Sequence, residues 1–255
     1  MMHKSQIDIV KLELKPNNEL KDGELPSAKL LPNPMLYAAF SCRSDAVSEL
    51  YNMDCVEGLK HYQNKYFDLA ICDPPYGIGA SEMTLGTGKN KRYSKGKNWD
   101  NETPLLEYFI ELFRVSKNQI IWGGNYFTDK LPVSRGWIYW DKQLNKDVSF
   151  ADGEMAWTSF DKVIKTAKVQ YSGFLGADVE RIHPTQKPER LYNWILEHYA
   201  EKGMRILDTH CGSGSSRISC YKNGFDFVGF EIDKQYCEAS EKRFVNAISQ
   251  QRLSF

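Results

Sequence analysis

Residues Phe67–Cys72 read FDLAIC, a nearly unbroken apolar run of strand length. A strand can carry apolar side chains on both faces only when both faces of its sheet are covered, which is typical of parallel sheets with helical crossovers. Further strand-like segments alternate along the chain with amphipathic helical segments. We therefore expect an α/β fold with a mostly parallel, seven-stranded sheet and helices on both faces.

The expected strands and helices extend from residue 49 to residue 248. Strands are expected at 49–52, 67–72, 119–122, 137–140, 155–157, 204–207 and 225–230, with 137–140 and 155–157 as an antiparallel pair. Helices are expected at 56–62, from Thr103-Pro104, from Pro188, at 215–223 and at 234–248. In the helix after Thr103, the threonine is expected to be the cap and Pro104 the first helical residue. Its apolar stripe is expected to contain Leu105, Leu106, Phe109, Ile110 and Phe113.

The charge balance excludes a polycationic, histone-like binder, because 33 Lys and Arg residues match 33 Asp and Glu residues. Nucleic acid remains a partner only where positive charge gathers locally. No apolar run reaches the roughly 18–20 residues of a membrane-spanning helix, and the first ten residues lack the apolar region of a secretory signal. The six cysteines form no CxxC pair. We expect reduced thiols, no bound metal, no membrane contact and a cytoplasmic location.

One large domain is expected at residues 46–250, after a segment 1–45, rich in Lys, Asn and Pro, that we expect to be an arm or cover. Two stretches in the domain, 80–102 and 161–182, lack periodicity. Between Gly88 and Lys97, the first contains five basic residues and no acid; such a run is usually a solvated loop and is by itself weak evidence for nucleic acid. These residues are Lys89, Lys91, Arg92, Lys95 and Lys97.

A glycine-rich turn follows the expected strand 204–207 and reads Asp208-Thr-His-Cys-Gly212-Ser-Gly214-Ser. Its glycines let the backbone approach a ligand closely, and the helix N-terminus beyond them favours electronegative atoms. Glu231 ends the next strand, where an acid can accept hydrogen bonds from both ribose hydroxyls. The pattern indicates a nucleoside cofactor, with an ordinary glycine turn as the alternative. NAD is disfavoured because its fingerprint has a third glycine where Arg217 stands.

A second motif, Asp73-Pro74-Pro75-Tyr76, directly follows the expected strand 67–72. The prolines fix φ and remove two backbone donors. A carboxylate, a rigid carbonyl and an aromatic ring are thus presented at the carboxyl end of a parallel strand, where such sheets bind ligands. A simple strand stop is the weaker alternative.

The two motifs, DPPY and DxxxGxG, together resemble those of the DNA amino-methyltransferases, which transfer a methyl group from S-adenosylmethionine to exocyclic amines. The Asp form is similar to the N6-adenine enzymes, whereas Ser is commoner in N4-cytosine enzymes and Asn in RNA- and protein-directed relatives. Because Asp73 precedes Asp208, the motif order is circularly permuted, as in the β class of bacterial and phage enzymes. Four further segments match the family, so that the resemblance covers about residues 49–244. They are Tyr51-Asn-Met-Asp54-Cys, Trp122-Gly-Gly-Asn125-Tyr, His183-Pro-Thr-Gln-Lys187-Pro188 and Phe230-Glu231-Ile-Asp233.

The resemblance implies a single Rossmann-like methyltransferase domain that binds S-adenosylmethionine and flips an adenine out of double-stranded DNA. Its catalytic residues would be Asp73, Pro74, Pro75 and Tyr76. The Asp73 carboxylate and the Pro74 carbonyl would accept the amine hydrogens, and Tyr76 would stack on the flipped base. The five basic residues between 89 and 97 would contact DNA phosphates, and the segment 161–182 would make base-specific contacts. The cofactor-binding residues that it implies are Asp54, Cys72, Asp73, Thr185, Lys187, Asp208, Cys211, Gly212, Ser213, Gly214, Ser215, Glu231 and Ile232.

One departure from the family pattern is Thr209-His210, which stands where the family usually has Pro-Phe. We expect His210 to fill the packing role of the Phe and not to act as a general base. Two alternatives stay open: an N4-cytosine or RNA amino-methyltransferase of the same fold, and a catalytically inactive DNA-binding module, which the intact motifs disfavour. A homodimer and a partner restriction endonuclease also stay open.

Overall fold

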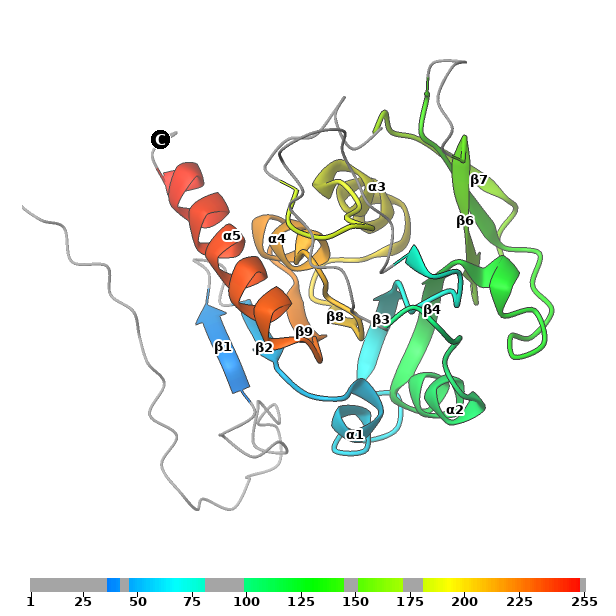
Figure 1. The fold of residues 1–255 in the computed structure, drawn as a ribbon, viewed down its shortest axis with the longest axis horizontal. Helices are drawn as coiled ribbons and strands as arrows, with labels where there is room; N and C mark the ends of the chain where they lie inside the picture. Colours follow the sequence, from blue (N-terminus) through cyan, green and yellow to red (C-terminus); the bar gives the residue numbers. More distant parts are fainter. Residues whose placement is uncertain (1–35, 42–45, 81–98, 145–150, 172–180, 253–255) are drawn as a thin grey trace, which may run out of the picture.

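The computed structural model of this chain describes residues 36–41, 46–80, 99–144, 151–171 and 181–252. In these residues, helices cover both faces of one large sheet (Figure 1). The α/β class, the mostly parallel sheet and the two helical layers are therefore confirmed. No helix in these ranges is long and apolar enough to cross a membrane.

The sheet has nine strands in the order β1-β2-β9-β8-β3-β4-β6-β5-β7. The strands β2, β9, β8, β3 and β4 are parallel neighbours, and β5 pairs antiparallel with β6, as the sequence predicted. The bounds are Leu36–Ser41 (β1), Val47–Tyr51 (β2), Phe67–Cys72 (β3), Ser116–Trp122 (β4), Trp137–Asp141 (β5), Gly153–Thr158 (β6), Lys165–Lys168 (β7), Arg205–Asp208 (β8) and Asp226–Phe230 (β9).

The prediction of seven strands was wrong, because two edge strands have no strong sequence pattern. β1 comes from the segment 1–45 that was expected to be an arm, and it pairs antiparallel with β2. The domain therefore begins before residue 46, while residues 1–35 and 42–45 lie outside the described ranges. β7 comes from the segment 161–182 and pairs with β5, although Ala167 is its only buried residue. An edge strand exposes much of its surface to water, so apolar alternation does not reveal it.

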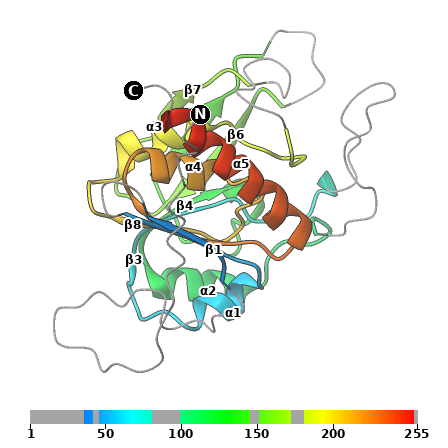
Figure 2. The same cartoon turned by 90° about the vertical axis from the view of Figure 1, so that its left-hand side faces the viewer.

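Helices form a layer on each face of the sheet (Figure 2). α1 (Cys55–Leu59) and α2 (Leu106–Val115) contact each other on one face, and α3 (Glu189–Tyr199), α4 (Ser215–Lys222) and α5 (Lys234–Arg252) form the layer on the other. Alternate residues of β3 belong to different apolar clusters: Leu69 and Ile71 to one, Ala70 and Cys72 to the other. The FDLAIC strand is thus buried on both faces, as its composition predicted.

α2 differs from its prediction in its start and in its buried face. The helix begins at Leu106 with Leu105 as its cap residue, so Thr103 is not the cap; its hydroxyl accepts a hydrogen bond from Lys130 Nζ. Apolar residues surround most of this helix, so periodicity alone could not select the face that packs against the sheet. The buried residues are Tyr108, Phe109, Leu112 and Val115, whereas Leu105, Leu106 and Ile110 are exposed.

The strand order reverses between the parallel neighbours β3 and β8, because the chain leaves them toward opposite edges of the sheet. β3 continues through α2 to β4 on one side, whereas β8 continues through α4 to β9 on the other. The loops after two such strands diverge and leave a crevice at their carboxyl ends, which is where open α/β sheets bind ligands. The DPPY turn and the glycine turn both begin at this crevice.

Candidate active site

A buried carboxylate that the sequence analysis did not single out holds the turn after β3. Asp100 Oδ1 accepts hydrogen bonds from the backbone N–H groups of Tyr76 and Gly77 at 2.6 and 3.0 Å. Its Oδ2 accepts one from the backbone N–H of Ala80 at 2.7 Å. Hydrogen bonds to a charged acceptor are among the stronger ones, so Asp100, which is 1% exposed, sets the path of the DPPY turn.

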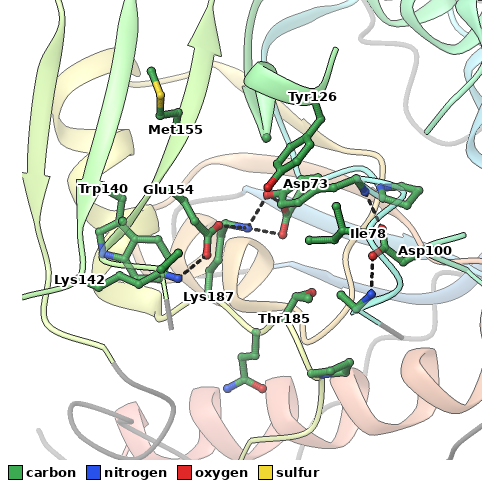
Figure 3. A pocket seen from close by; sticks show the side chains of 18 of the residues that line it. Asp73, Ile78, Asp100, Tyr126, Trp140, Lys142, Glu154, Met155, Thr185 and Lys187 are labelled. Atoms are coloured by element: carbon green, nitrogen blue, oxygen red, sulfur yellow. Dashed lines mark hydrogen bonds and ion pairs between the residues drawn. The ribbon is translucent and has the colours of Figure 1, made fainter. Parts of the chain in front are cut away.

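Asp73 accepts hydrogen bonds on both of its carboxylate oxygens (Figure 3). Oδ1 accepts from the Tyr76 hydroxyl at 2.6 Å, and Oδ2 accepts from the Lys187 ammonium at 2.5 Å. Burial raises the pKa of the Asp73 carboxyl above its ordinary value, and the Lys187 ammonium opposes that rise. A carboxylate has about four lone-pair sites. Asp73 can therefore accept a further hydrogen from a ligand.

Glu154 on β6 and Lys142 after β5 continue this cluster away from Asp73 (Figure 3). Lys187 Nζ lies 3.2 Å from Glu154 Oε2, and Lys142 Nζ lies 2.8 Å from Glu154 Oε1. Burial by itself would raise the pKa of Glu154, but the two ammonium groups lower it to about 2. Charges thus alternate along a row of four side chains. The sequence analysis missed Glu154 and Lys142, since neither belongs to a recognisable motif.

The Tyr76 ring stacks on Tyr126, with ring centroids 5.1 Å apart and planes inclined by 13°. Gly123, with a φ of +68°, makes this contact possible, because a Cβ there would lie 2.2 Å from the Tyr76 ring. Tyr126 is 44% exposed. The aromatic surface predicted for Tyr76 is therefore shared by two rings.

Two cavities meet at the DPPY turn. The larger, about 620 Å³, extends from Asp73 and Tyr76 past Tyr126 to Glu154 and Lys142. The smaller, about 310 Å³, extends from the same turn to the glycine turn and Glu231. Their common wall consists of Asp73, Pro75, Trp99, Thr185, Gln186 and Lys187.

The glycine turn is tied to the end of β9. Glu231 Oε2 accepts a hydrogen bond from the Gly212 N–H at 2.9 Å, and Oε1 accepts one from the Asp233 N–H at 2.8 Å. Gly212 and Gly214 have φ values of +48° and +72°, a region that favours glycine. The turn can take this path because of the two glycines.

The smaller cavity brings together most of the residues that the sequence analysis assigned to the cofactor. Asp54 is one of them, although its side chain also caps α1 by accepting a hydrogen bond from the Glu57 N–H. The assigned residues on its wall are Asp54, Asp73, Thr185, Lys187, Cys211, Gly212, Ser213, Glu231 and Ile232. Cys72, Asp208, Gly214 and Ser215 are not on this wall.

The four residues that are not on the wall are buried. Asp208 is 1% exposed, and its oxygens accept hydrogen bonds from the His210 N–H and the Ser216 hydroxyl. Burial raises the pKa of Asp208 to about 7. Ser215 Oγ accepts a hydrogen bond from Arg243, and Cys72 lies in the core under α2. Residues of the motif thus stabilise the turn as well as line the cavity.

Several residues of the smaller cavity were not assigned to the cofactor, although most of them stand within the quoted motif segments; Trp99, Tyr192 and Tyr236 stand outside them. The Nε1–H of Trp99 is buried and finds no acceptor among the described residues, which marks it as a donor for a ligand. His210 packs edge-on against Tyr108, and burial lowers its pKa to about 4, in agreement with a packing role. The missed residues are Met53, Cys55, Trp99, His183, Gln186, Tyr192, Thr209, His210, Asp233 and Tyr236.

The predicted DNA contacts cannot be placed in this site. Lys89, Lys91, Arg92, Lys95 and Lys97 lie outside the described residues, as do residues 172–180 of the segment 161–182. The described cysteines are free thiols, and no cluster of described side chains could hold a metal ion.

Comparison with known proteins identifies the class that this fold and site define. The sequence model of the N6/N4 DNA methylases matches residues 125–242. Over these residues, the chain is similar to this family of DNA methylases. The predicted resemblance to DNA amino-methyltransferases, enzymes that use S-adenosylmethionine as the methyl donor, is therefore confirmed.

Individual DNA methyltransferases are similar to this chain over most of its length. The Type II methyltransferase M.HpaI of Haemophilus parainfluenzae is 24% identical over 232 residues, which cover 74% of this chain and 72% of the relative. M.HinfI of Haemophilus influenzae is 26% identical over 250 residues, 78% of this chain and 69% of its own length. The crystal structure of the M1.HpyAVI–SAM complex superposes with a TM-score of 0.51 and 21% identity, over 76% of this chain and 98% of that one. This last likeness shows the fold.

Proposed function

We propose that the protein methylates the N6 amine of an adenine flipped out of double-stranded DNA. The observation that carries the proposal is that two cavities meet at Asp73-Pro74-Pro75-Tyr76. A methyl donor in the smaller cavity and a base in the larger one would face each other at this turn. The amine of a paired base lies inside the duplex, so the base must leave the stack to react here.

The chemistry of the smaller cavity suits S-adenosylmethionine. Glu231 supplies a carboxylate for the ribose hydroxyls, and the turn at Gly212 allows close approach of the backbone. The Trp99 Nε1–H is a donor for the carboxylate at the methionine end of the ligand. When bound, S-adenosylmethionine supplies an electrophilic methyl group on a sulfonium. Lys187 also lies on the wall of this cavity, between Asp73 and Glu154.

The catalytic residues act on the amine. The Asp73 carboxylate and the Pro74 carbonyl each accept one amine hydrogen, which directs the nitrogen lone pair toward the smaller cavity. The negative charge of Asp73 stabilises the positive charge that grows on the nitrogen during attack. The raised pKa of Asp73 suits it to accept the proton that the methylated amine loses. Tyr76 and Tyr126 provide the stacking surface.

Finer parts of the proposal rest on the family resemblance. They are phosphate contacts by the basic segment 89–97, a homodimer, a restriction endonuclease with the same recognition sequence, and action on DNA in the cytoplasm of a bacterial or phage-infected cell. The Type II names of the Haemophilus relatives support the endonuclease partner.

The proposal is tested by product identification. The protein is incubated with unmethylated plasmid DNA and S-adenosylmethionine labelled in the methyl group, and the DNA is digested to nucleosides for chromatography. We expect label in N6-methyldeoxyadenosine, and none with the Asp73→Ala variant. Label only in cytosine, or transfer only to RNA, would contradict the proposal.

A further inference from the structure

Three charged side chains line the larger cavity in a row: Asp73, Lys187 and Glu154. Lys187 lies between the two carboxylates (Figure 3). Its Nζ is 2.5 Å from Asp73 Oδ2 and 3.2 Å from Glu154 Oε2. The Lys187 side chain is 3% exposed, and those of Asp73 and Glu154 are 15% and 26% exposed. The row therefore offers a ligand an acceptor, a donor and an acceptor, in that order.

We propose that this row reads the Watson–Crick edge of the flipped base and selects adenine over cytosine. The inference rests on the proposed function and adds Lys187 and Glu154 to it as residues that read the base. Along this edge, adenine has the N6 amine, the acceptor N1 and the weakly donating C2–H. That order is complementary to Asp73, Lys187 and Glu154.

Cytosine differs from adenine at the third position of this edge. Its N4 amine and N3 would meet Asp73 and Lys187 just as well, but its O2 acceptor would face the Glu154 carboxylate. In a buried site, an acceptor that faces a carboxylate is left without a donor and is repelled by the negative charge, which disfavours the base that brings it there. Glu154 thus discriminates between adenine and cytosine, whereas Lys187 would donate a hydrogen bond to either base.

The hydrogen bonds of Lys187 leave one hydrogen for the base. Its Nζ lies 2.5 Å from Asp73 Oδ2, 3.2 Å from Glu154 Oε2 and 3.3 Å from the Tyr76 hydroxyl. The hydrogen directed at this hydroxyl can turn to N1 of the base, because the hydroxyl itself donates to Asp73. Lys142, 2.8 Å from Glu154, keeps that carboxylate paired meanwhile.

Base analogues in the DNA test the proposed hydrogen bond from Lys187 to N1 of adenine, with the unmodified protein. The methylated sequence is first located in plasmid DNA treated with the protein, and duplexes are then made with an analogue in place of the target adenine. We expect 1-deazaadenine, which lacks the N1 acceptor, to react about 10–100-fold more slowly in a single turnover at saturating DNA. 7-deazaadenine is the matched control and should stay within about threefold of adenine, because no hydrogen bond to N7 is proposed. Equal rates for 1-deazaadenine and adenine, or a defect confined to 7-deazaadenine, would overturn the inference.

The Glu154→Gln variant tests whether Glu154 selects adenine over cytosine. Its amide can donate a hydrogen bond to O2, so the ratio of adenine to cytosine methylation at the target position should fall by about tenfold or more. Glu107→Gln on α2, where the Glu107 side chain is 58% exposed, is the matched control and should keep the wild-type ratio. An unchanged ratio in a Glu154→Gln protein that melts normally would overturn the inference. If that variant does not fold, the analogue series decides. Absence of N6-methyladenine with the wild-type protein would instead refute the proposed function.

Discussion

The Asp73 carboxylate receives hydrogen bonds from Tyr76 and Lys187 and, in the proposed reaction, one more from the target amine. Asp73→Asn keeps one acceptor oxygen but loses the charge that stabilises the transition state. We expect the single-turnover rate of methyl transfer at saturating DNA and S-adenosylmethionine to fall by about 10²-fold or more, as after loss of an oxyanion-hole donor.

The control for this variant is its folding and binding. Asp73→Asn should bind DNA and S-adenosylmethionine within a few-fold of the wild type, since the amide occupies the same space. A parallel loss of thermal stability and of both binding activities would assign Asp73 a structural role. A near-wild-type rate would point to another acceptor.

Asp208 imposes a pH dependence on stability that one substitution can isolate. Burial raises its pKa from 3.8 to about 7, so the native state binds more protons than the unfolded state between these pH values. Stability from this group is therefore fully present below about pH 4 and is lost as pH rises toward 7. His210, with its pKa lowered to about 4, acts in the opposite direction between pH 4 and 6.5, because the unfolded state binds the extra proton.

Asp208→Asn should remove the pH dependence of stability that comes from Asp208 and leave the one that comes from His210. We expect the melting temperature of the variant, relative to the wild type, to increase from pH 4 to pH 7 and then to level off. Differential scanning calorimetry over this range measures the difference, in which the contributions of other carboxylates cancel. A difference that does not change with pH would mean that Asp208 is ionised in the native protein throughout.

At the scale of elements, the turn at residues 73–80, directly after β3, depends on the side chain of Asp100, which lies outside it. Asp100→Asn keeps the acceptor for Tyr76 and Gly77 but can place an N–H group against the Ala80 N–H. The lost charge-assisted hydrogen bond, worth about 1.5–3 kcal/mol, should let the turn open. We expect hydrogen exchange of the Ala80 amide to accelerate about 10–100-fold and the single-turnover rate to fall, with little change in the exchange of β8.

Asp129→Asn is the matched control for this variant, because the Asp129 side chain is 72% exposed and contacts only Lys130 among the described ion pairs. Asp129→Asn should alter neither the hydrogen exchange of the Ala80 amide nor the single-turnover rate of methyl transfer. Unchanged exchange at Ala80 in Asp100→Asn would mean that the turn holds its path without the carboxylate.

At the scale of the whole molecule, a net charge of zero requires the DNA-binding charge to be local. If the segment 89–97 contacts phosphates, replacing Lys89 and Lys91 with Ala should reduce the slope of log affinity against log salt by up to about 2. Lys117→Ala with Lys202→Ala is the matched control, because both lysines precede or begin strands at the opposite end of the sheet from the cavities. Fluorescence anisotropy at several salt concentrations measures both slopes. Equal slopes for the wild type and the Lys89, Lys91 variant would make the segment a solvated loop.

Much of the fold and half of the site could be predicted from the sequence, because the relevant signals are local. An apolar run predicts a doubly buried strand, paired glycines predict a turn of positive φ, and Asp-Pro-Pro-Tyr predicts a rigid strand end. The parallel sheet then places Asp73 and Glu231 at one edge, since parallel strands share their carboxyl ends.

Only the tertiary structure decided the remaining features, because they depend on neighbours distant in the chain. The strand β7 exists through its pairing with β5, and α2 buries the face that its contacts select. Asp100 and Glu154 are ordinary acids in the sequence, whereas in the fold one accepts three backbone hydrogen bonds and the other lies in a row with Lys187 and Asp73. The sequence alone therefore determined where the chemistry is located. The fold decided which charges surround it, because charge pairing in a buried site requires contacts that no local pattern encodes.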